Sequence, residues 1–479
     1  MAKKTKAKML DGQGSMILPD ANRAIEDIYE EIRDVYQTDD RPWVIGYSGG
    51  KDSTTSLQLI WYALSKLPKS KLKKPVYVIS SDTLVETPHV ISFIDQTLEK
   101  IVSAAKEQNL PFEAHKVQPI IEESFWVNLI GRGYPTPSIT FRWCTERMKI
   151  KPADRFIMDK VSKHGEVVVV LGVRKGESAT RDQVINLHQI KGTILNRHTR
   201  FSQAYVYTPV VDFSVEDIWM YLSLVKNPWG GDNQELIDLY KASQAGECPL
   251  VVDDTTPSCG NSRFGCWTCT VVGKDKTMES LSGTDKWLKP LLKYRNFLAE
   301  TLDPERKKEV RSFKRSKGQV TLKHDKTAVV RGPYKLSFCE ELLEELLKTQ
   351  EQVRLLSGDP DITLIYNAEL HEIRRIWRLE KGDWQDRVPR IYKDVTNKEL
   401  AWVDDDGAAF NYNDYKMLEK ICEKHEVPTE LVVRLIEVER ATMGMTRRSS
   451  VYQRLTKILA EEWRPEEEVM ESLKDEFEV

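Results

Sequence analysis

The sequence predicts an α/β protein in which a parallel sheet carries helices on both faces, followed by a mainly helical C-terminal region. Between residues 41 and 225, short β-rich runs alternate with helical patterns, as is typical of a parallel sheet. From residue 286 onward the pattern is mostly that of charged helices. The chain has 479 residues, 40% hydrophobic and 30% charged, which indicates a soluble globular protein with room for more than one domain.

The elements are expected in four parts. Residues 1–40 hold a basic tail and then an amphipathic helix, because apolar residues recur at helical spacing in ANRAIEDIYEEIRDVYQ. Residues 41–225 form the α/β domain, residues 226–285 an irregular Cys-rich segment, and residues 286–479 a basic segment with a helical domain. The five strands expected in the α/β domain are PWVIGYS, KPVYVISSD, FEAHKVQP, GEVVVVLGVR and AYVYTPVVD.

Charge and hydropathy limit the function classes. The formal net charge of -3 gives no general affinity for polyanions, so any contact with nucleic acid needs a local basic patch. No apolar run approaches the roughly 18 residues of a membrane helix, so no membrane association is expected. The start of the chain is basic but has no apolar segment of a signal peptide, and we expect a cytoplasmic protein.

The stretch GYSGGKDST, residues 46–54, follows the first strand and opens a helix. A Walker A loop needs a glycine where Ile45 stands, five residues before Gly50, and a serine or threonine where Asp52 follows Lys51. The spacing of the glycines also excludes the Rossmann fingerprint. This loop therefore belongs to neither of the two common phosphate-binding patterns.

The chemistry of the loop nevertheless fits a pyrophosphate. Gly49 and Gly50 let the backbone approach an anion, Ser48 and Ser53 offer hydroxyls, and Lys51 supplies charge. The amides at the start of the following helix point toward the same position. The bland alternative is a glycine-rich turn that only opens a helix.

The pattern S-G-G-x-D-S after a strand resembles the PP-loop ATP pyrophosphatases, also called adenine nucleotide alpha hydrolase-like proteins. The resemblance implies cleavage of ATP between its α- and β-phosphates, with Lys51 and Asp52 as catalytic residues. Lys51 and a Mg²⁺ ion would stabilise the charge that grows on the departing pyrophosphate.

Polar residues follow two further strands. Asp82 and Thr83 end the second strand, and Arg174 and Glu177 follow the strand VVVVL, so we expect all four to face the nucleotide crevice. Each has a bland alternative, such as a surface ion pair between Arg174 and Glu177. The order G-x-R-x-x-E-S-x-x-R, then P-x-x-D-x-x-x-x-D-x-W around Asp217, resembles the phosphoadenosine-phosphosulfate (PAPS) reductase branch of the PP-loop group.

Seven cysteines are too few for a disulfide scaffold of this length, and four of them lie between Cys248 and Cys269. The C-x2-C pair of Cys266 and Cys269 suits either zinc or an iron-sulfur cluster. A thioredoxin-type pair fits less well, because this pair does not open a helix after a strand. Cys339 and Cys422 stand in helical patterns and are expected to be ordinary buried residues.

The chain as a whole resembles the DndC family, the ATP pyrophosphatases of DNA phosphorothioation systems. The resemblance covers about residues 20–350 and rests on the PP-loop, FRWCTERMKIKP, LGVRKGESATR and above all CGNSRFGCWTC. It implies a 4Fe-4S cluster, a cysteine desulfurase as sulfur donor, and DndD and DndE partner subunits. The implied cluster ligands are Cys144, Cys259, Cys266 and Cys269.

One clustered cysteine is left over by this ligand set. We interpret Cys248 as a catalytic sulfur acceptor, and its exchange with Cys259 in the ligand set stays open. A cluster held by only three cysteines, with one iron left to carry sulfur, is also compatible with the sequence.

The expected function is that of a DNA phosphorothioation sulfurtransferase, which adenylates a backbone phosphate oxygen with ATP so that sulfur can replace it. A sulfonucleotide reductase is one alternative, although the sequence contains no E-C-G-L-H segment. A non-catalytic DNA-binding subunit with a structural metal is another, and tRNA thiolation fits the cysteine segment less well.

DNA contact requires a basic surface, and residues 306–335 offer one. They contain eleven Lys and Arg against Glu309 and Asp325, an excess of nine positive charges. A solvated helix face is the usual explanation of such a run. The alternative is a basic loop near the DNA phosphates, with Lys314, Arg315 and Lys317 at its centre.

Overall fold

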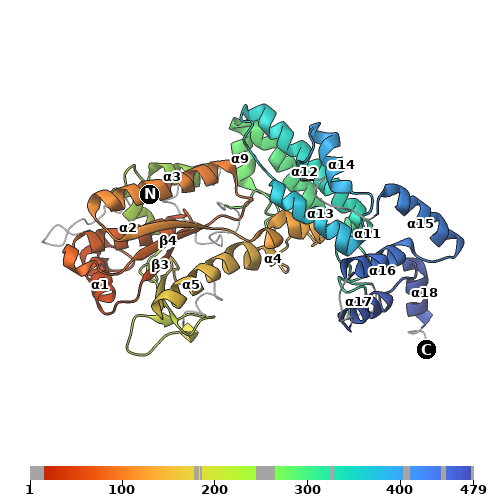
Figure 1. The fold of residues 1–479 in the computed structure, drawn as a ribbon. Coiled ribbons are helices and arrows are strands. Elements are labelled where there is room, and N and C mark those ends of the chain that lie inside the picture. Colours follow the sequence, from red (N-terminus) through yellow and green to blue (C-terminus); the bar gives the residue numbers. More distant parts are fainter. Residues whose placement is uncertain are drawn as a thin grey trace. The chain divides into compact units, whose positions relative to one another are not determined.

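The computed structural model describes residues 16–176, 183, 186–243, 265–323, 328–402, 410–443 and 449–475 (Figure 1). The chain forms two compact units, each built from several segments. The first unit comprises residues 1–119, 144–267 and 274–284, and the second comprises residues 120–143, 268–273 and 285–479.

A six-stranded sheet forms the centre of the first unit, in the order β5-β4-β3-β6-β8-β7. The first five of these are parallel, and all five strands expected from the sequence are present. The short edge strand β7 runs antiparallel to β8 and was not expected. The strands are β3 (Trp43–Gly46), β4 (Val76–Ser81), β5 (Phe112–Val117), β6 (Val167–Val170), β7 (Asn196–Arg197) and β8 (Ala204–Tyr207).

Helices cover both faces of this sheet, because successive side chains of a strand point to opposite faces. In β3, Trp43 and Ile45 pack into a core with α1, α2, α3 and α7, whereas Val44 packs into the core that includes Ile157 of α5. The expected two-faced α/β architecture is therefore confirmed. The helices are α1 (Ile25–Gln37), α2 (Lys51–Ser65), α3 (Pro88–Gln108), α5 (Lys151–His164) and α7 (Val215–Leu224).

The strand order reverses at β3. The chain runs from β3 to β4 and β5 on one side, then returns to place β6 on the other side of β3. The two strands are in register, with Ile45 opposite Val170, so their carboxyl ends lie next to each other. Open α/β sheets bind their ligands at such a switch point.

The first unit also contains several shorter elements. Strands β1 and β2 form a small antiparallel pair, and α8 and α9 pack together. The bounds are β1 (Ile17–Leu18), β2 (Arg23–Ala24), α8 (Gln234–Ser243) and α9 (Lys276–Thr284), with π-helical turns at Glu146–Ile150 and, in the second unit, at Val127–Gly131.

The second unit is helical, as expected for the C-terminal region. It also includes residues 120–143, which the sequence places in the 41–225 domain. The reason is tertiary packing: Trp126 Nε1 donates to the Leu364 carbonyl, and Trp377 Nε1 donates to the Ile130 carbonyl. Its helices are α10 (Lys289–Glu300), α11 (Pro304–Val310), α12 (Leu336–Ser357), α13 (Asn367–Lys381), α14 (Arg387–Thr396), α15 (Tyr412–Lys424), α16 (Thr429–Ala441), α17 (Ser449–Leu459) and α18 (Glu466–Asp475), and α4 (Trp143–Thr145) lies where the chain passes between units.

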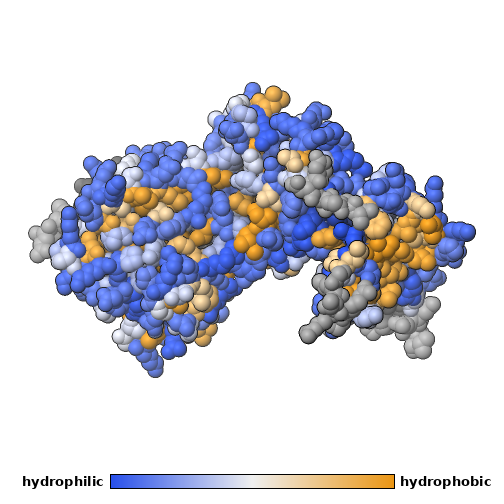
Figure 2. Space-filling view, in the orientation of Figure 1, coloured by the Kyte–Doolittle hydropathy of each residue, from blue (hydrophilic) through white to orange (hydrophobic). Residues whose placement is uncertain are grey.

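The surface of the second unit includes apolar side chains. In Figure 2, hydrophobic residues gather over the region of α15 and α16, where Met417, Ile421 and Val427 are exposed. Cys339 and Cys422, by contrast, are buried as expected. Within the described ranges, every helix is too short or too polar to span a bilayer.

Asp217 is a structural residue in the first unit. Its carboxylate accepts from the backbone N–H of Ser214 at 3.1 Å, while Ser214 Oγ accepts from Asp217 N–H, so the two residues form a capping box at the start of α7. The same carboxylate accepts from the N–H groups of Asp20 and Ala21. It thereby joins the N-terminal segment to α7.

We expect Asp217→Ala to lower the free energy of unfolding by about 1–3 kcal/mol, because three N–H groups lose the charged acceptor that they share. Urea denaturation of the full chain measures this change. Glu216→Ala, one residue earlier and exposed, is the matched control and should be close to neutral. Equal losses in the two variants would contradict the role assigned to Asp217.

Candidate functional site

The PP-loop connects β3 to α2, and its backbone conformation depends on glycine. Gly49 has a φ of 73°, which side chains other than glycine adopt rarely. A Cβ on Gly50 would lie 3.3 Å from Tyr240 Oη and 3.4 Å from Ser48 Oγ. Side chains therefore pack closely against the loop, while its glycines keep the backbone accessible, as the binding of a pyrophosphate would require.

The two loop serines face each other. Ser48 Oγ and Ser53 Oγ are 3.1 Å apart, and the Ser48 N–H donates to Ser53 Oγ at 3.2 Å. Ser53 Oγ in turn donates to the Gly50 carbonyl. The hydroxyls thus link the two ends of the loop, and both lie where the first amides of α2 begin.

A buried chain of charges lies beside the loop. Lys51 Nζ is 2.9 Å from Asp52 Oδ2, and Arg174 Nε donates to Asp52 Oδ1. Lys51 and Arg174 are only 6% and 3% exposed, so this is no surface ion pair. Two cations therefore contact the same carboxylate in a setting shielded from water, where charge-assisted hydrogen bonds are strong.

Gly172, at the end of β6, makes this contact possible. A Cβ at this position would lie 2.8 Å from the backbone of Asp52 and of Ser53. The first turn of α2 therefore approaches the β6 end more closely than any other residue would allow. The sequence pattern G-x-R contains this glycine but gives no sign of its role.

Tyr240 of α8 is a site residue that the sequence did not reveal. Its hydroxyl accepts from the N–H of Lys51 at 3.3 Å. Its ring lies edge-on to Trp219 of α7, with centroids 4.9 Å apart, and the Lys51 ammonium is 5.7 Å from the ring centroid. No local periodicity marks a tyrosine 189 residues from the loop that it contacts.

Asp82 and Thr83, which follow β4, make hydrogen bonds within the loop after this strand. Asp82 accepts from the Leu84 N–H at 2.9 Å and from Gln118 Nε2 at 2.8 Å. The N–H and Oγ1 of Thr83 both donate to Glu86 Oε2, at 2.8 and 2.6 Å. A contact of either residue with nucleotide stays a prediction.

Cys266 lies against this β4 loop. Its Sγ is 3.3 Å from Thr83 Oγ1, and its backbone bridges that of Glu86. Burial raises the pKa of the Cys266 thiol to about 12, the Glu86 carboxylate adds to this, and Lys149 opposes it. Cys144 is close enough to contribute as well, so the first unit brings two of the predicted cluster ligands together.

The rest of the predicted ligand set is not assembled by the described residues. Cys269 belongs to the second unit, where its carbonyl accepts from Arg295 Nε at 3.0 Å. Cys248, Cys259 and Glu177 lie outside the described residues. Among the residues described, no three His, Cys, Asp or Glu side chains are grouped closely enough to hold a metal ion. Neighbouring thiols do suit a soft metal, which would stabilise the Cys266 thiolate that burial disfavours.

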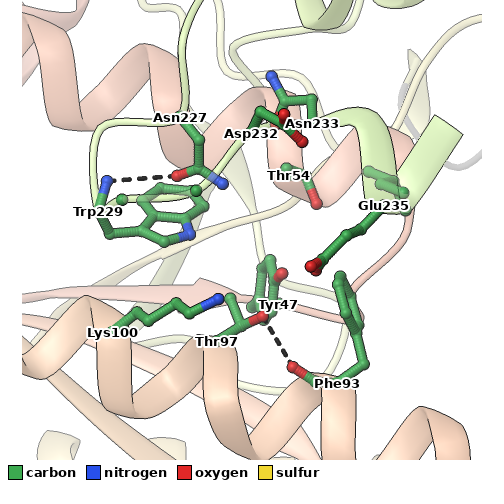
Figure 3. A pocket seen from close by; sticks show the side chains of 13 residues that line it. Tyr47, Thr54, Phe93, Thr97, Lys100, Asn227, Trp229, Asp232, Asn233 and Glu235 are labelled. Atoms are coloured by element: carbon green, nitrogen blue, oxygen red, sulfur yellow. Dashed lines mark hydrogen bonds between the residues drawn. The ribbon is translucent and has the colours of Figure 1, made fainter.

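A small hollow lies beside the PP-loop, between α2, α3 and residues 227–236 (Figure 3). Lys100 and Trp229 lie together on one of its sides, and the Thr97 hydroxyl donates to the Phe93 carbonyl. Its volume of about 20 Å³ is enough for one water molecule and far too small for a nucleotide. This hollow therefore has no room for a nucleotide, and nucleotide binding at the cradle stays a prediction.

The predicted basic segment is more ordered than a solvated helix face. After α11 it folds back through bridges between Arg311 and Tyr334 and between Leu322 and Val329. The Arg311 guanidinium donates to the carbonyls of Arg331 and Gly332, and burial lowers its pKa.

Only part of the positive excess of this segment faces solvent. Arg315 and Lys317 are exposed, whereas the Lys314 ammonium lies over the Trp463 ring, 4.4 Å from its centroid. Arg331 is paired with Glu466. If this segment binds DNA, its exposed residues make the contact.

Comparison with known proteins gives two family matches. Residues 42–272 match the phosphoadenosine phosphosulfate reductase domain, and residues 414–460 match a small protein found in certain Dnd DNA modification systems. The first unit thus carries most of a PAPS reductase-like domain. The second match links the C-terminal helices to Dnd DNA modification systems.

Individual relatives are distant. An uncharacterized protein of Methanocaldococcus jannaschii is 26% identical over 214 residues, which cover 44% of this chain and 38% of that protein. The Candida auris PAPS reductase in complex with phosphate is 16% identical, covering 53% of this chain and 99% of that one, with a TM-score of 0.26. A Candida glabrata FMN adenylyltransferase variant is 12% identical, covering 42% and 57%, also with a TM-score of 0.26. The strand order and the domain match, not these superpositions, establish the fold.

We expect Gly172→Ala to weaken ATP binding about tenfold, because overpacking against the first turn of α2 costs about 1–3 kcal/mol. Isothermal titration of the full chain with ATP measures the affinity. Gly283→Ala in α9 is the matched control, since a Cβ there meets nothing within 4 Å. Unchanged affinity in a folded Gly172→Ala protein would show that the close approach does not shape the cradle.

Proposed function

We propose that this protein is a DNA phosphorothioation sulfurtransferase that uses ATP to activate a DNA backbone phosphate. The observation that carries the proposal is the contact of Asp52 with both Lys51 and Arg174 in a glycine-built cradle. This cradle follows the carboxyl end of β3. The contact between Thr83 and Cys266 lies just after the carboxyl end of the neighbouring strand β4. Nucleotide chemistry and sulfur chemistry are therefore supported by adjacent strands of one sheet.

In the first step, a non-bridging oxygen of the DNA phosphate attacks the α-phosphorus of ATP. A new P–O bond forms, the bond from the α-phosphorus to the β-bridging oxygen breaks, and pyrophosphate leaves with the electron pair. The loop amides and Lys51 hold the phosphates, and Arg174 fixes the Asp52 carboxylate beside them. Mg²⁺ would supply further neutralisation of the departing pyrophosphate.

In the second step, sulfur at the oxidation level of hydrosulfide attacks the DNA phosphorus. A P–S bond forms, the P–O bond to the adenylate breaks, and AMP leaves with the original DNA oxygen. We assign Cys248 as the residue that accepts sulfur from a cysteine desulfurase as a persulfide, and a second thiol supplies the two electrons for its release. A 4Fe-4S cluster held by Cys144, Cys259, Cys266 and Cys269 would supply electron transfer, and only a cluster held by three of these cysteines would leave an iron free to bind sulfide.

The proposed setting is a cytoplasmic complex with DndD- and DndE-type subunits. The support for it is the similarity of residues 414–460 to a small protein of Dnd systems. The main competing function is that of a sulfonucleotide reductase, which the domain match at residues 42–272 favours. A purely DNA-binding subunit would have no use for the buried Lys51–Asp52–Arg174 arrangement.

We expect Lys51→Met to lower pyrophosphate release from ATP in the presence of DNA by about 10²–10³-fold, because one preorganised charge on the developing pyrophosphate is lost. Methionine preserves the volume of the buried side chain. Release of labelled pyrophosphate and AMP is the measurement, and Lys66→Met at the exposed end of α2 is the control.

The products also separate the competing functions. Formation of ADP and phosphate instead of AMP and pyrophosphate would contradict the proposal. Reduction of a sulfonucleotide to sulfite would favour the reductase, and absence of any pyrophosphate release would favour a binding subunit.

We expect the double variant Arg315→Gln, Lys317→Gln to bind duplex DNA more weakly. The slope of log K against log salt concentration should decrease in magnitude by about one to two, because each phosphate contact contributes about 0.9 to this slope. Fluorescence anisotropy at several salt concentrations measures this slope. Lys69→Gln with Lys71→Gln removes the same charge from exposed positions in the first unit and serves as the control. An unchanged slope would show that DNA is held elsewhere.

A further inference from the structure

The second unit contains a hollow of about 320 Å³ whose wall is formed mainly by arginines. It is distinct from the PP-loop, and neither the family matches nor the proposed chemistry assigns it a ligand. Its lining residues are His371, Arg374, Arg375, Arg378 and Leu379 of α13, Trp402, and Arg440 of α16.

The spacing along α13 places these side chains on one face of the helix. Positions 371, 374, 375 and 378 are separated by three or four residues, which stand above one another in a helix. Like charges at i and i+4, such as Arg374 and Arg378, destabilise a helix by about 0.2–0.5 kcal/mol. An anion bound in the hollow would reduce the repulsion between these arginines.

Carboxylates hold the guanidinium groups in place. Arg374 donates twice to Asp386, with both distances 2.7 Å, and Arg375 donates twice to Glu372, at 2.7 and 2.8 Å. Glu437 accepts from Arg440 Nε at 2.9 Å. None of these carboxylates lines the hollow, so the part of its wall that the described residues form is cationic.

A bidentate pair leaves donors for a second anion. A guanidinium carries five N–H groups in a planar fork, and a carboxylate takes up two of them. Arg375 and Arg440 are 42% and 25% exposed, so both are accessible from solvent. Their orientation is fixed in advance, which lowers the entropic cost of binding a phosphate.

An aromatic ring completes the wall. The Trp402 indole lies edge-on to His371, with centroids 5.1 Å apart, and the Arg374 guanidinium is 5.5 Å from its centroid. Trp402 Nε1 is shielded from solvent and has no hydrogen-bond partner among the described residues. An indole beside guanidinium groups is the combination that binds a base together with its phosphate.

We propose that this arginine hollow binds a nucleotide through its phosphate. The volume is that of a typical small-ligand pocket, and the ring distinguishes a nucleotide from an acidic peptide. A strand of DNA as the source of that nucleotide rests on the proposed function. Arg440 lies in the 414–460 segment that resembles a small Dnd-system protein, so that segment contributes directly to the site.

The test compares two charge-matched double variants of the full chain. Arg375→Gln with Arg440→Gln removes two charges from the wall, whereas Lys393→Gln with Lys416→Gln removes two exposed charges elsewhere in the second unit. Binding of labelled single-stranded and duplex oligonucleotides is measured by anisotropy without ATP, and binding of AMP by calorimetry. Arg374 and Arg378 are left intact because they are buried.

We expect the wall variant to bind oligonucleotide at least about tenfold more weakly than wild type. The slope of log K against log salt concentration should decrease in magnitude by about two, and the control variant should behave as wild type. Loss of AMP binding alone would support the site with free nucleotide as its ligand. Equal binding of both ligands by wild type and wall variant would overturn the proposal, as would binding of an acidic peptide but of neither nucleotide ligand.

Two further measurements keep the result interpretable. Thermal unfolding shows whether the wall variant folds, and Trp402→Leu, which removes no charge, should weaken single-stranded more than duplex binding. Pyrophosphate release by wild type is assayed separately. If wild type releases no pyrophosphate, the proposed function is contradicted but the ligand of the hollow is not. If wild type releases pyrophosphate and the wall variant binds oligonucleotide and AMP normally, the ligand of the hollow is contradicted but the proposed function is not.

Discussion

The first unit depends on the contact between Asp52 and Arg174 across the reversal of strand order. Asp52 stands at the start of α2, after β3, and Arg174 follows β6, which lies beside β3 in the sheet. The contact forms only because Gly172 lets the first turn of α2 approach the β6 end. One partly buried carboxylate therefore contacts both cations and links the start of α2 to the segment after β6.

The same sheet places thiol chemistry one strand away. Thr83 and Glu86 form a buried hydrogen-bonded pair after β4, and Cys266 rests against it. Because the carboxyl ends of parallel strands lie at one edge, a nucleotide in the cradle and a sulfur carrier near Cys266 share a common scaffold. This proximity is the physical argument for the proposal that one protein combines ATP cleavage with sulfur transfer.

The second unit provides a different kind of electrostatics. The PP-loop holds two cations around one carboxylate in a buried setting, whereas the arginine hollow presents guanidinium groups that carboxylates orient from behind. The first arrangement suits a charge that develops during reaction, and the second suits a charge that is already present on a ligand. The basic segment at residues 306–335 divides in the same way between internal pairing and exposed charge.

The sequence by itself determined the five parallel strands, the two-faced helix packing and the position of the PP-loop between β3 and α2, because period-two and helical patterns and a short glycine motif are local properties. It also predicted that Asp82 and Thr83 follow β4 and that Arg174 follows β6. Tertiary structure alone decided that Tyr240 contacts Lys51, that Gly172 is a point of close approach, and that residues 120–143 pack with the helical unit. It alone brought Arg440 to the arginines of α13. These outcomes depend on contacts between residues far apart in the chain, which no local pattern encodes.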